Sequence, residues 1–141
     1  ERAGRIDAAL SDLRLILDDQ PDSHQALNAY GYALLVHRDQ AAEALPYLER
    51  ALELAPESAA VLDSVGWARF RLGQHEAALA LLRQAWERQR MPEVAAHLGE
   101  ALWVLGRRDE AREVWRAGLR ISLSDATLNQ TLDRLLETRS P

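Results

Sequence analysis

Four histidines are the residues whose chemistry would best suit proton transfer or metal binding, and they are widely separated, at positions 24, 37, 75 and 97. None of them stands in an HExxH or another metal-binding spacing. His97 and Glu100 lie three residues apart, on one face of a predicted helix, and this spacing predicts a structural hydrogen bond between them. A catalytic or metal site needs further partners that the spacing does not supply. We therefore expect no enzymatic activity, no metal site and no cofactor.

Charge restricts the class of partner. The 141-residue chain carries a net charge of −5, and all 17 of its basic residues are arginines. Residues 1–63 contain 12 acids and 5 arginines, whereas residues 83–120 contain 8 arginines and 6 acids. Nucleic acid binding requires a continuous basic track, so we expect no nucleic acid partner. No apolar run reaches the ~18 residues of a membrane span, so we also expect no transmembrane segment.

The spacing of large and small apolar residues predicts pairs of antiparallel helices, most clearly between residues 59 and 91. The large residues that would form the contact faces are Leu62, Val65, Leu79 and Leu82. The small residues that would allow the two helices to cross closely are Gly66, Ala78 and Ala85. Gly73 provides a left-handed residue at the end of the first helix. This pattern resembles the tetratricopeptide repeat, a pair of helices that recurs with a period near 34 residues.

The resemblance implies an all-α fold, a right-handed superhelix or α-solenoid that forms a single domain. It divides the chain into a half-repeat at residues 1–21, three full repeats at 24–58, 59–91 and 92–124, and a capping helix at 125–138. The half-repeat leads us to expect further repeats upstream, in a longer protein. On its helix, Leu10, Leu13 and Leu17 form an apolar face that we expect to find a neighbouring molecule.

Several residues mark helix ends. Ser23 and Ser58 are predicted N-caps, and Ser124 or Asp125 is predicted to cap the last helix. Pro92 suits the first turn of a helix, where its missing N–H costs nothing. The first full repeat has one residue more than the others between its glycine and its alanine. We expect this residue in the turn at positions 37–40, which lacks the usual glycine.

In tetratricopeptide arrays the first helices of successive repeats line a concave surface, and the resemblance places a set of partner-binding residues there. They are Asn28, Tyr32, Leu35, Asp63, Trp67, Phe70, Arg71, Glu100 and Trp103. Gln25 and Glu93 are further polar positions of the same groove. An aromatic groove of this kind suits an extended or helical peptide with apolar anchors. Two alternatives remain open, namely that the aromatics form the core, or that a terminal segment or a second copy of the chain fills the groove.

A second resemblance concerns particular members of this class. Chaperone-tail-binding proteins use a clamp of lysines, an arginine and asparagines, whereas this chain has no lysine and carries Tyr32 and Trp67 at clamp positions. The segments LDSVGWARFRLG and PEVAAHLGEALWVLGRRDEAREVW resemble the C-terminal repeats of proteobacterial outer-membrane lipoproteins. Proteins of this group include adaptors for a periplasmic carboxyl-terminal processing protease.

The leading hypothesis is a non-catalytic protein-binding scaffold in the bacterial cell envelope, with the protease or its substrates as partners. The resemblance implies the periplasm or the inner face of the outer membrane, through a lipid anchor outside this chain; the cytoplasm is the alternative. The second function hypothesis is self-association through the N-terminal helix, with no outside ligand in the groove.

Overall fold

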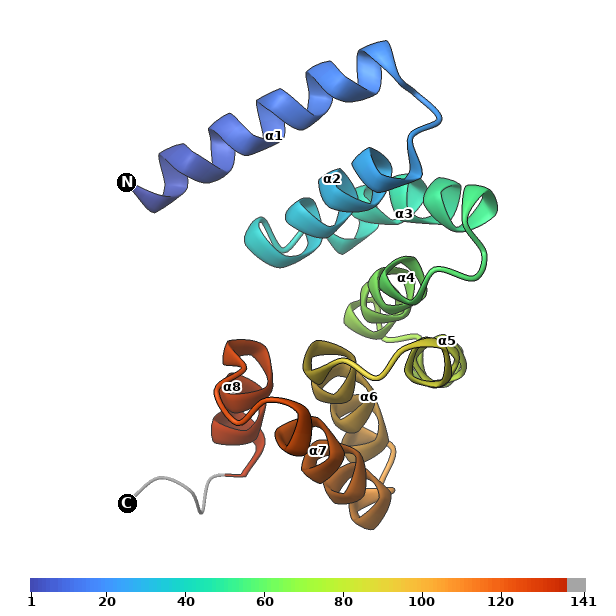
Figure 1. The fold of residues 1–141 in the computed structure, drawn as a ribbon, viewed down its shortest axis with the longest axis vertical. Helices are drawn as coiled ribbons and strands as arrows, with labels where there is room; N and C mark the ends of the chain where they lie inside the picture. Colours follow the sequence, from blue (N-terminus) through green and yellow to red (C-terminus); the bar gives the residue numbers. More distant parts are fainter. Residues whose placement is uncertain (137–141) are drawn as a thin grey trace.

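The computed structural model describes residues 1–136, which form eight helices and no strand (Figure 1). The helices are α1 (Arg2–Asp19), α2 (His24–His37), α3 (Ala41–Leu54), α4 (Ala59–Arg71), α5 (His75–Arg88), α6 (Pro92–Val104), α7 (Arg108–Ile121) and α8 (Ala126–Leu135). The prediction of an all-α array with a half-repeat, three helix pairs and a terminal helix is confirmed. The predicted capping helix extended to residue 138, and its last two positions lie outside the described residues.

The helices are arranged as a curved stack of pairs. Helices α2 and α3, α4 and α5, and α6 and α7 pack as hairpins, and each hairpin packs on the next. We call α2, α4 and α6 the inner helices and α3, α5 and α7 the outer helices. Successive inner helices contact one another, α1 packs on α2, and α8 packs on α6 at the other end of the stack (Figure 1).

Side-chain caps begin four of the helices, and three of these caps were predicted from the sequence. Ser23, Ser58 and Asp125 each accept a hydrogen bond from the backbone N–H three residues further on, at 3.2, 3.3 and 3.0 Å. Pro92 lies in the first turn of α6. These contacts satisfy N–H groups that have no partner inside the helix, and the predicted helix starts are confirmed.

A left-handed residue ends the inner helix of every hairpin. Gly73 and Gly106 have φ angles of 84° and 85°, and Asp39 takes the same place in the first hairpin with a φ of 53°. There the backbone N–H of Gln40 donates to the carbonyl of Leu34, six residues back, whereas the matching bond spans five residues at the other two turns. The additional residue therefore lies at this turn, as predicted, and an aspartate replaces the glycine.

The paired helices approach most closely at one glycine in each inner helix. A Cβ atom built on Gly99 would lie 1.9 Å from the indole Nε1 of Trp115, which is itself buried. At Gly31 and Gly66 the added atom would lie 2.6 and 2.9 Å from a leucine of the outer helix. No side chain larger than hydrogen fits these crossings unless the facing residue moves.

The apolar face of α1 differs from the prediction. Leu17 is buried against the array, and Leu10 and Leu13 are half-buried. The large apolar residues that α1 exposes are Leu15 and Ile16, at 68% and 44%. The expected face is turned toward the array because α1 packs along α2, so the apolar surface left for another molecule is a different one, around Leu15 and Ile16.

The crossing at Gly99 generates a stability prediction. Gly99→Ala should lower the free energy of unfolding by about 1–3 kcal/mol, the usual range for overpacking a filled core, because the indole of Trp115 has to shift. The matched control is Gly4→Ala on α1, where the nearest atom lies at 3.4 Å and alanine should be neutral or favourable. Urea unfolding followed by circular dichroism measures both variants. Equal stability of the two would show that the crossing at Gly99 is not tight.

Candidate partner-binding surface

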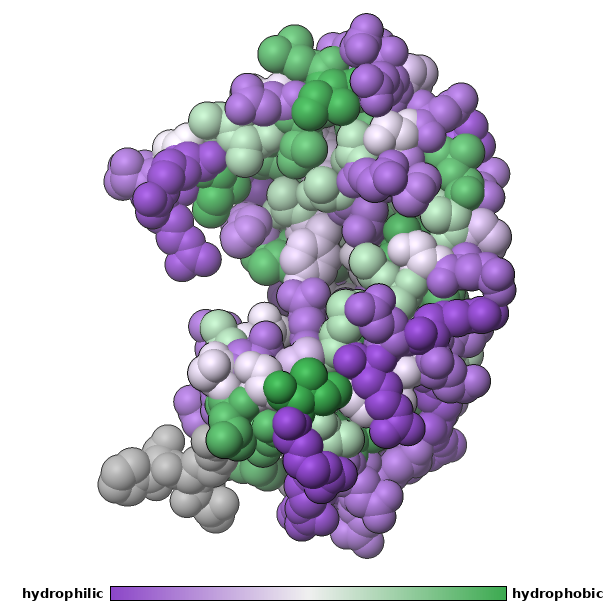
Figure 2. Space-filling view, viewed as in Figure 1, coloured by the Kyte–Doolittle hydropathy of each residue, from purple (hydrophilic) through white to green (hydrophobic). Residues whose placement is uncertain are grey.

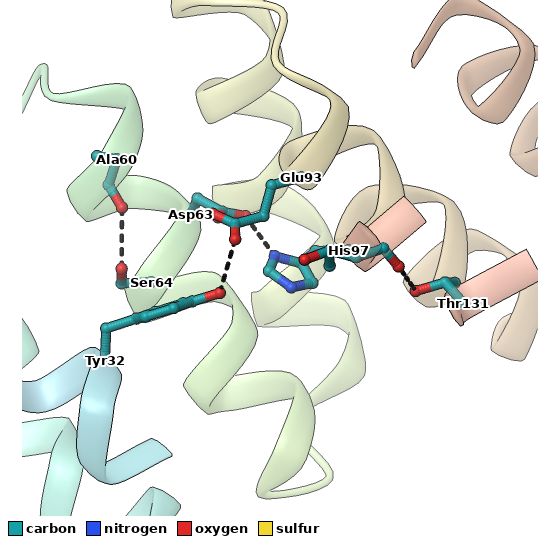
Figure 3. A network of polar contacts seen from close by, with 8 residues as sticks. Tyr32, Ala60, Asp63, Ser64, Glu93, His97 and Thr131 are labelled. Carbon is teal, nitrogen blue, oxygen red and sulfur yellow. Dashed lines mark hydrogen bonds and ion pairs between the residues drawn. The ribbon is translucent and has the colours of Figure 1, made fainter. Parts of the chain in front are cut away.

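A buried polar network joins the three inner helices. The His97 Nδ1 of α6 lies 2.8 Å from the Asp63 Oδ1 of α4, and the two residues are only 3% and 2% exposed. Beside them the Tyr32 hydroxyl of α2 donates a 3.0 Å hydrogen bond to the Glu93 Oε2 of α6 (Figure 3). The second bond passes over α4 and joins residues 61 positions apart. Polar side chains thus connect three successive repeats in one place.

The electrostatics of this network favour a protonated histidine. Burial alone lowers the pKa of His97, but the negative charges of Asp63, Glu93 and Glu100 outweigh that effect and raise the pKa above its ordinary value. Burial, followed by the charge of Asp63, raises the pKa of Glu93. Burial and the charge of Glu93 also raise the pKa of Tyr32, so its hydroxyl remains a donor. A charged imidazolium loses its hydration when it is buried. The ion pair with Asp63 compensates for that loss.

The predicted hydrogen bond between His97 and Glu100 is wrong. The imidazole bonds Asp63 on the neighbouring helix, and Glu100 pairs with Arg134 of α8 at 2.5 and 3.0 Å. Glu100 is also buried. Its carboxylate therefore binds the terminal helix in this structure, and α8 covers that part of the predicted groove.

The predicted aromatic groove floor is mostly core. Leu35 has no accessible surface, and Trp67 and Phe70 are only 8% and 9% exposed. The indole of Trp67 stacks on the ring of Phe70, with centroids 4.9 Å apart, and on His97, with centroids 4.2 Å apart. The prediction that these three residues face an open groove therefore needs correction, because their side chains are buried in the apolar core of the protein.

The other predicted residues are dispersed. Trp103 is half-buried next to α7, where the guanidinium groups of Arg108 and Arg112 lie 4.3 and 5.1 Å from its ring centre. Arg71 is exposed and forms a 2.5 Å ion pair with Asp39, so it belongs to the hairpin turns. The structure does not bring these two side chains together with the buried network.

Asn28 and Tyr32 remain half-buried on α2, one helical turn apart. The Asn28 Oδ1 is a buried oxygen with no hydrogen-bond partner in the described part of the chain. With Glu93, which is also half-buried, they form the accessible polar part of the inner-helix surface. We call Asn28, Tyr32 and Glu93 the concave polar set. In the space-filling view the molecule is hollowed at its left edge, between α1 and α8 (Figure 2).

Among residues 1–136, no group of three histidine, aspartate or glutamate side chains is arranged to hold a metal ion. None of the helices described there combines the length and the apolar character that crossing a membrane requires.

Stacked helix pairs with short turns and a terminal helix define an α-solenoid, a class of repeat proteins. Sequence models of the tetratricopeptide repeat match residues 1–59 and 69–127, which together cover most of the chain. The chain is therefore built from tetratricopeptide repeats.

One relative is close in sequence. The TPR repeat-containing protein PA4667 of Pseudomonas aeruginosa is 44% identical over 89 residues, or 63% of this chain. The match spans 15% of that protein's length.

Solved structures of more distant proteins share the fold. The thermophilic TPR protein TTC0263 of Thermus thermophilus superimposes with a TM-score of 0.78 over 96% of this chain and 75% of its own, at 23% identity. The crystal structure of MamA matches with a TM-score of 0.73 over 98% of this chain and 81% of its own, at 20% identity. MamA from Desulfovibrio magneticus RS-1 matches with a TM-score of 0.69 over 89% and 71%, at 23% identity. Similarity at this level of identity concerns the fold alone.

The buried ion pair predicts a pH dependence of stability. Since the folded-state pKa of His97 lies above the ordinary value of 6.5, its protonation stabilises the fold fully below that pH. The stabilisation is lost as the pH rises through the folded-state pKa. His97→Gln should remove this loss, whereas His37→Gln, at the exposed end of α2, should leave it in place. Urea unfolding at a series of pH values tests the prediction, and identical pH profiles for wild type and His97→Gln would contradict it.

The burial of Trp67 predicts a large loss of stability on truncation. Trp67→Ala should lower the free energy of unfolding by about 3–5 kcal/mol, the range for deleting a buried aromatic side chain. Trp103→Ala should cost less, because Trp103 is half-buried. Denaturant midpoints of the two variants give the comparison. If Trp67→Ala were as stable as wild type, the indole would be free for a partner and our correction of the groove would fail.

Proposed function

We propose that this chain is a non-catalytic scaffold that binds a peptide or a partner protein across its concave surface. The tetratricopeptide fold suggests a protein–protein interaction scaffold. The observation that carries the finer proposal is the concave polar set, three half-buried polar side chains that α2 and α6 leave partly accessible on the inner-helix surface. Polar side chains that stay partly accessible can hydrogen-bond the backbone of a bound segment.

The neighbours of Asn28 indicate how a segment would bind. Tyr32 presents a ring beside Asn28, and Glu93 provides an acceptor that its bond to the Tyr32 hydroxyl fills only in part. A bound backbone can therefore find an apolar contact on Tyr32 of α2 and a hydrogen-bond acceptor on Glu93 of α6. This surface suits an extended or helical segment held mainly by polar contacts, with less aromatic anchoring than the sequence predicted.

For the whole protein, we propose a bacterial cell-envelope adaptor that acts on a periplasmic protease or its substrates. The support is the resemblance of residues 62–73 and 92–115 to outer-membrane lipoprotein repeats, together with a relative of bacterial origin. Fractionation of host cells that express the full-length protein tests the compartment, and recovery in the cytoplasm would overturn it.

Self-association is the second candidate function, and the exposed surface of α1 favours it. Leu15 and Ile16 are neighbouring large apolar residues on one helix, and both are open to solvent. A second copy that packed on them would bury apolar surface. A concentration-dependent mass in light scattering that Leu15→Ser and Ile16→Ser abolish would support this candidate, and a constant monomer mass would exclude it.

The concave proposal predicts a specific cross-linking result. A photoreactive phenylalanine analogue at Tyr32, in the full-length protein in host cells, should capture a defined partner protein, because this position lies on the accessible concave set. The same analogue at Ala42, an exposed position of the outer helix α3, is the control and should not capture that partner. Mass spectrometry identifies the cross-linked species. Equal capture at both positions, or none at Tyr32, would contradict binding at this surface.

A further inference from the structure

A cleft lies between two outer helices, on the side of the array away from the concave polar set. It has a volume of about 520 Å³ and separates α5 from α7, whose backbones do not pack on each other because α6 lies between them (Figure 1). Its floor is apolar: Trp86 and Leu98 are buried, and Val114 and Ala117 are half-buried. A cleft of this volume is in the range that accommodates a small ligand or a few residues of a peptide.

Some of the charged side chains around the cleft form ion pairs and others do not. Arg83 bridges the two helices through a bidentate pair with Glu110, at 2.5 and 3.1 Å, and the charge of Glu87 also acts on it. Glu110 is therefore paired with Arg83, whereas Glu87 forms no ion pair among the described residues. Arg116 and Arg120, one turn apart on α7, have no carboxylate within ion-pair distance in the part of the chain that the structure describes.

Arg90 adds a third cation from the opposite wall. Its guanidinium lies 5.0 Å from the ring centre of Trp86, which keeps it at the cleft, and it has no ion-pair partner among the described residues. The carboxylates that line the cleft without an ion pair among the described residues are Glu87 and Glu113. Three unpaired arginines face two unpaired glutamates in this cleft, so it combines an apolar floor with a net positive rim.

We propose that this cleft binds an acidic segment of a partner protein, with carboxylates on the arginines and an apolar side chain on the floor. Arginines bind carboxylates with paired, charge-assisted hydrogen bonds, and unpaired arginines have those donors available. A protein segment fits better than a nucleic acid, because base stacking requires an open ring and Trp86 is buried beneath Arg90. The site goes beyond the proposed function, since it shares no residue with the concave polar set.

The test uses a defined probe, an eight-residue labelled peptide of alternating acidic pairs and leucine, such as Glu-Asp-Leu-Glu-Asp-Leu-Glu-Asp. The reference peptide replaces every acid by its amide. Fluorescence anisotropy at about 0.05 and 0.15 M salt should show binding of the acidic peptide that weakens with salt, and much weaker binding of the amide peptide.

Removal of the unpaired charges should abolish most of this binding. Arg116→Gln with Arg120→Gln should weaken the acidic peptide about tenfold or more, since two charge-assisted contacts are lost. The matched control is Arg2→Gln with Arg5→Gln on α1, which changes the net charge equally at exposed positions and should change affinity less than about twofold. Arg90→Gln, in the connection between α5 and α6, is a second test from the opposite wall, and it should also weaken binding.

Three results would overturn the proposal. They are no binding of the acidic peptide to wild type below millimolar concentration, equal weakening by the cleft and control variants, and equal binding of the acidic and amide peptides. Tighter binding of a single-stranded oligonucleotide that depends on Arg116 and Arg120 would assign the cleft to nucleic acid instead. The cross-linking result at Tyr32 is independent of all these outcomes, so the two proposals can fail separately.

Discussion

The close crossing of the two helices in each hairpin is the constraint on which the rest of the structure depends. At Gly31, Gly66 and Gly99 the inner helix lies so near its partner that the facing side chain occupies the place of a Cβ atom. This contact sets the distance within each pair, and therefore the separation at which the next pair stacks. The inner surface and the outer cleft are each formed by residues from more than one hairpin. Their shapes therefore depend on the spacing between hairpins.

A second level of organisation is electrostatic. Burial of a charged His97 costs hydration free energy. The negative charges of Asp63 and the neighbouring carboxylates offset that cost. The ion pair joins α4 to α6, and the Tyr32–Glu93 bond adds α2. Close apolar packing joins the two helices of each hairpin, and the polar contacts of His97 and Tyr32 add to the packing between consecutive hairpins. The two levels are separable, since Gly99 acts within a repeat and His97 acts between repeats.

The sequence predicted the features that depend on local spacing. Helix pairs, the N-caps at Ser23 and Ser58 and the additional residue at the first turn all follow from residues less than one repeat apart. The contacts of the candidate surface were harder to predict, because they join different repeats. His97 has Glu100 three positions away, yet it bonds Asp63, 34 positions away on another helix. The signal in the sequence that could have predicted this contact is that Asp63 lies one repeat length before His97.

For a related reason, the sequence left open whether the aromatics line the groove or form the core. Groove position along a helix does not determine exposure, which depends on how strongly the array curves. Trp67 packs on His97 of the next inner helix, so a ring assigned to the groove became part of the core. Glu100 was also assigned to the groove, and it forms an ion pair with Arg134 of α8. That pair depends on how the terminal helix packs on α6.

The Tyr32–Glu93 bond also has a mechanical meaning. A solenoid deforms like a spring, by small rotations between neighbouring coils, and most of its contacts restrain only adjacent coils. This bond restrains the first and third coils directly, so the array cannot lengthen on its inner side without breaking it. The region around α4 is then the stiffest part of the spring, and elastic strain applied at the ends should concentrate outside it.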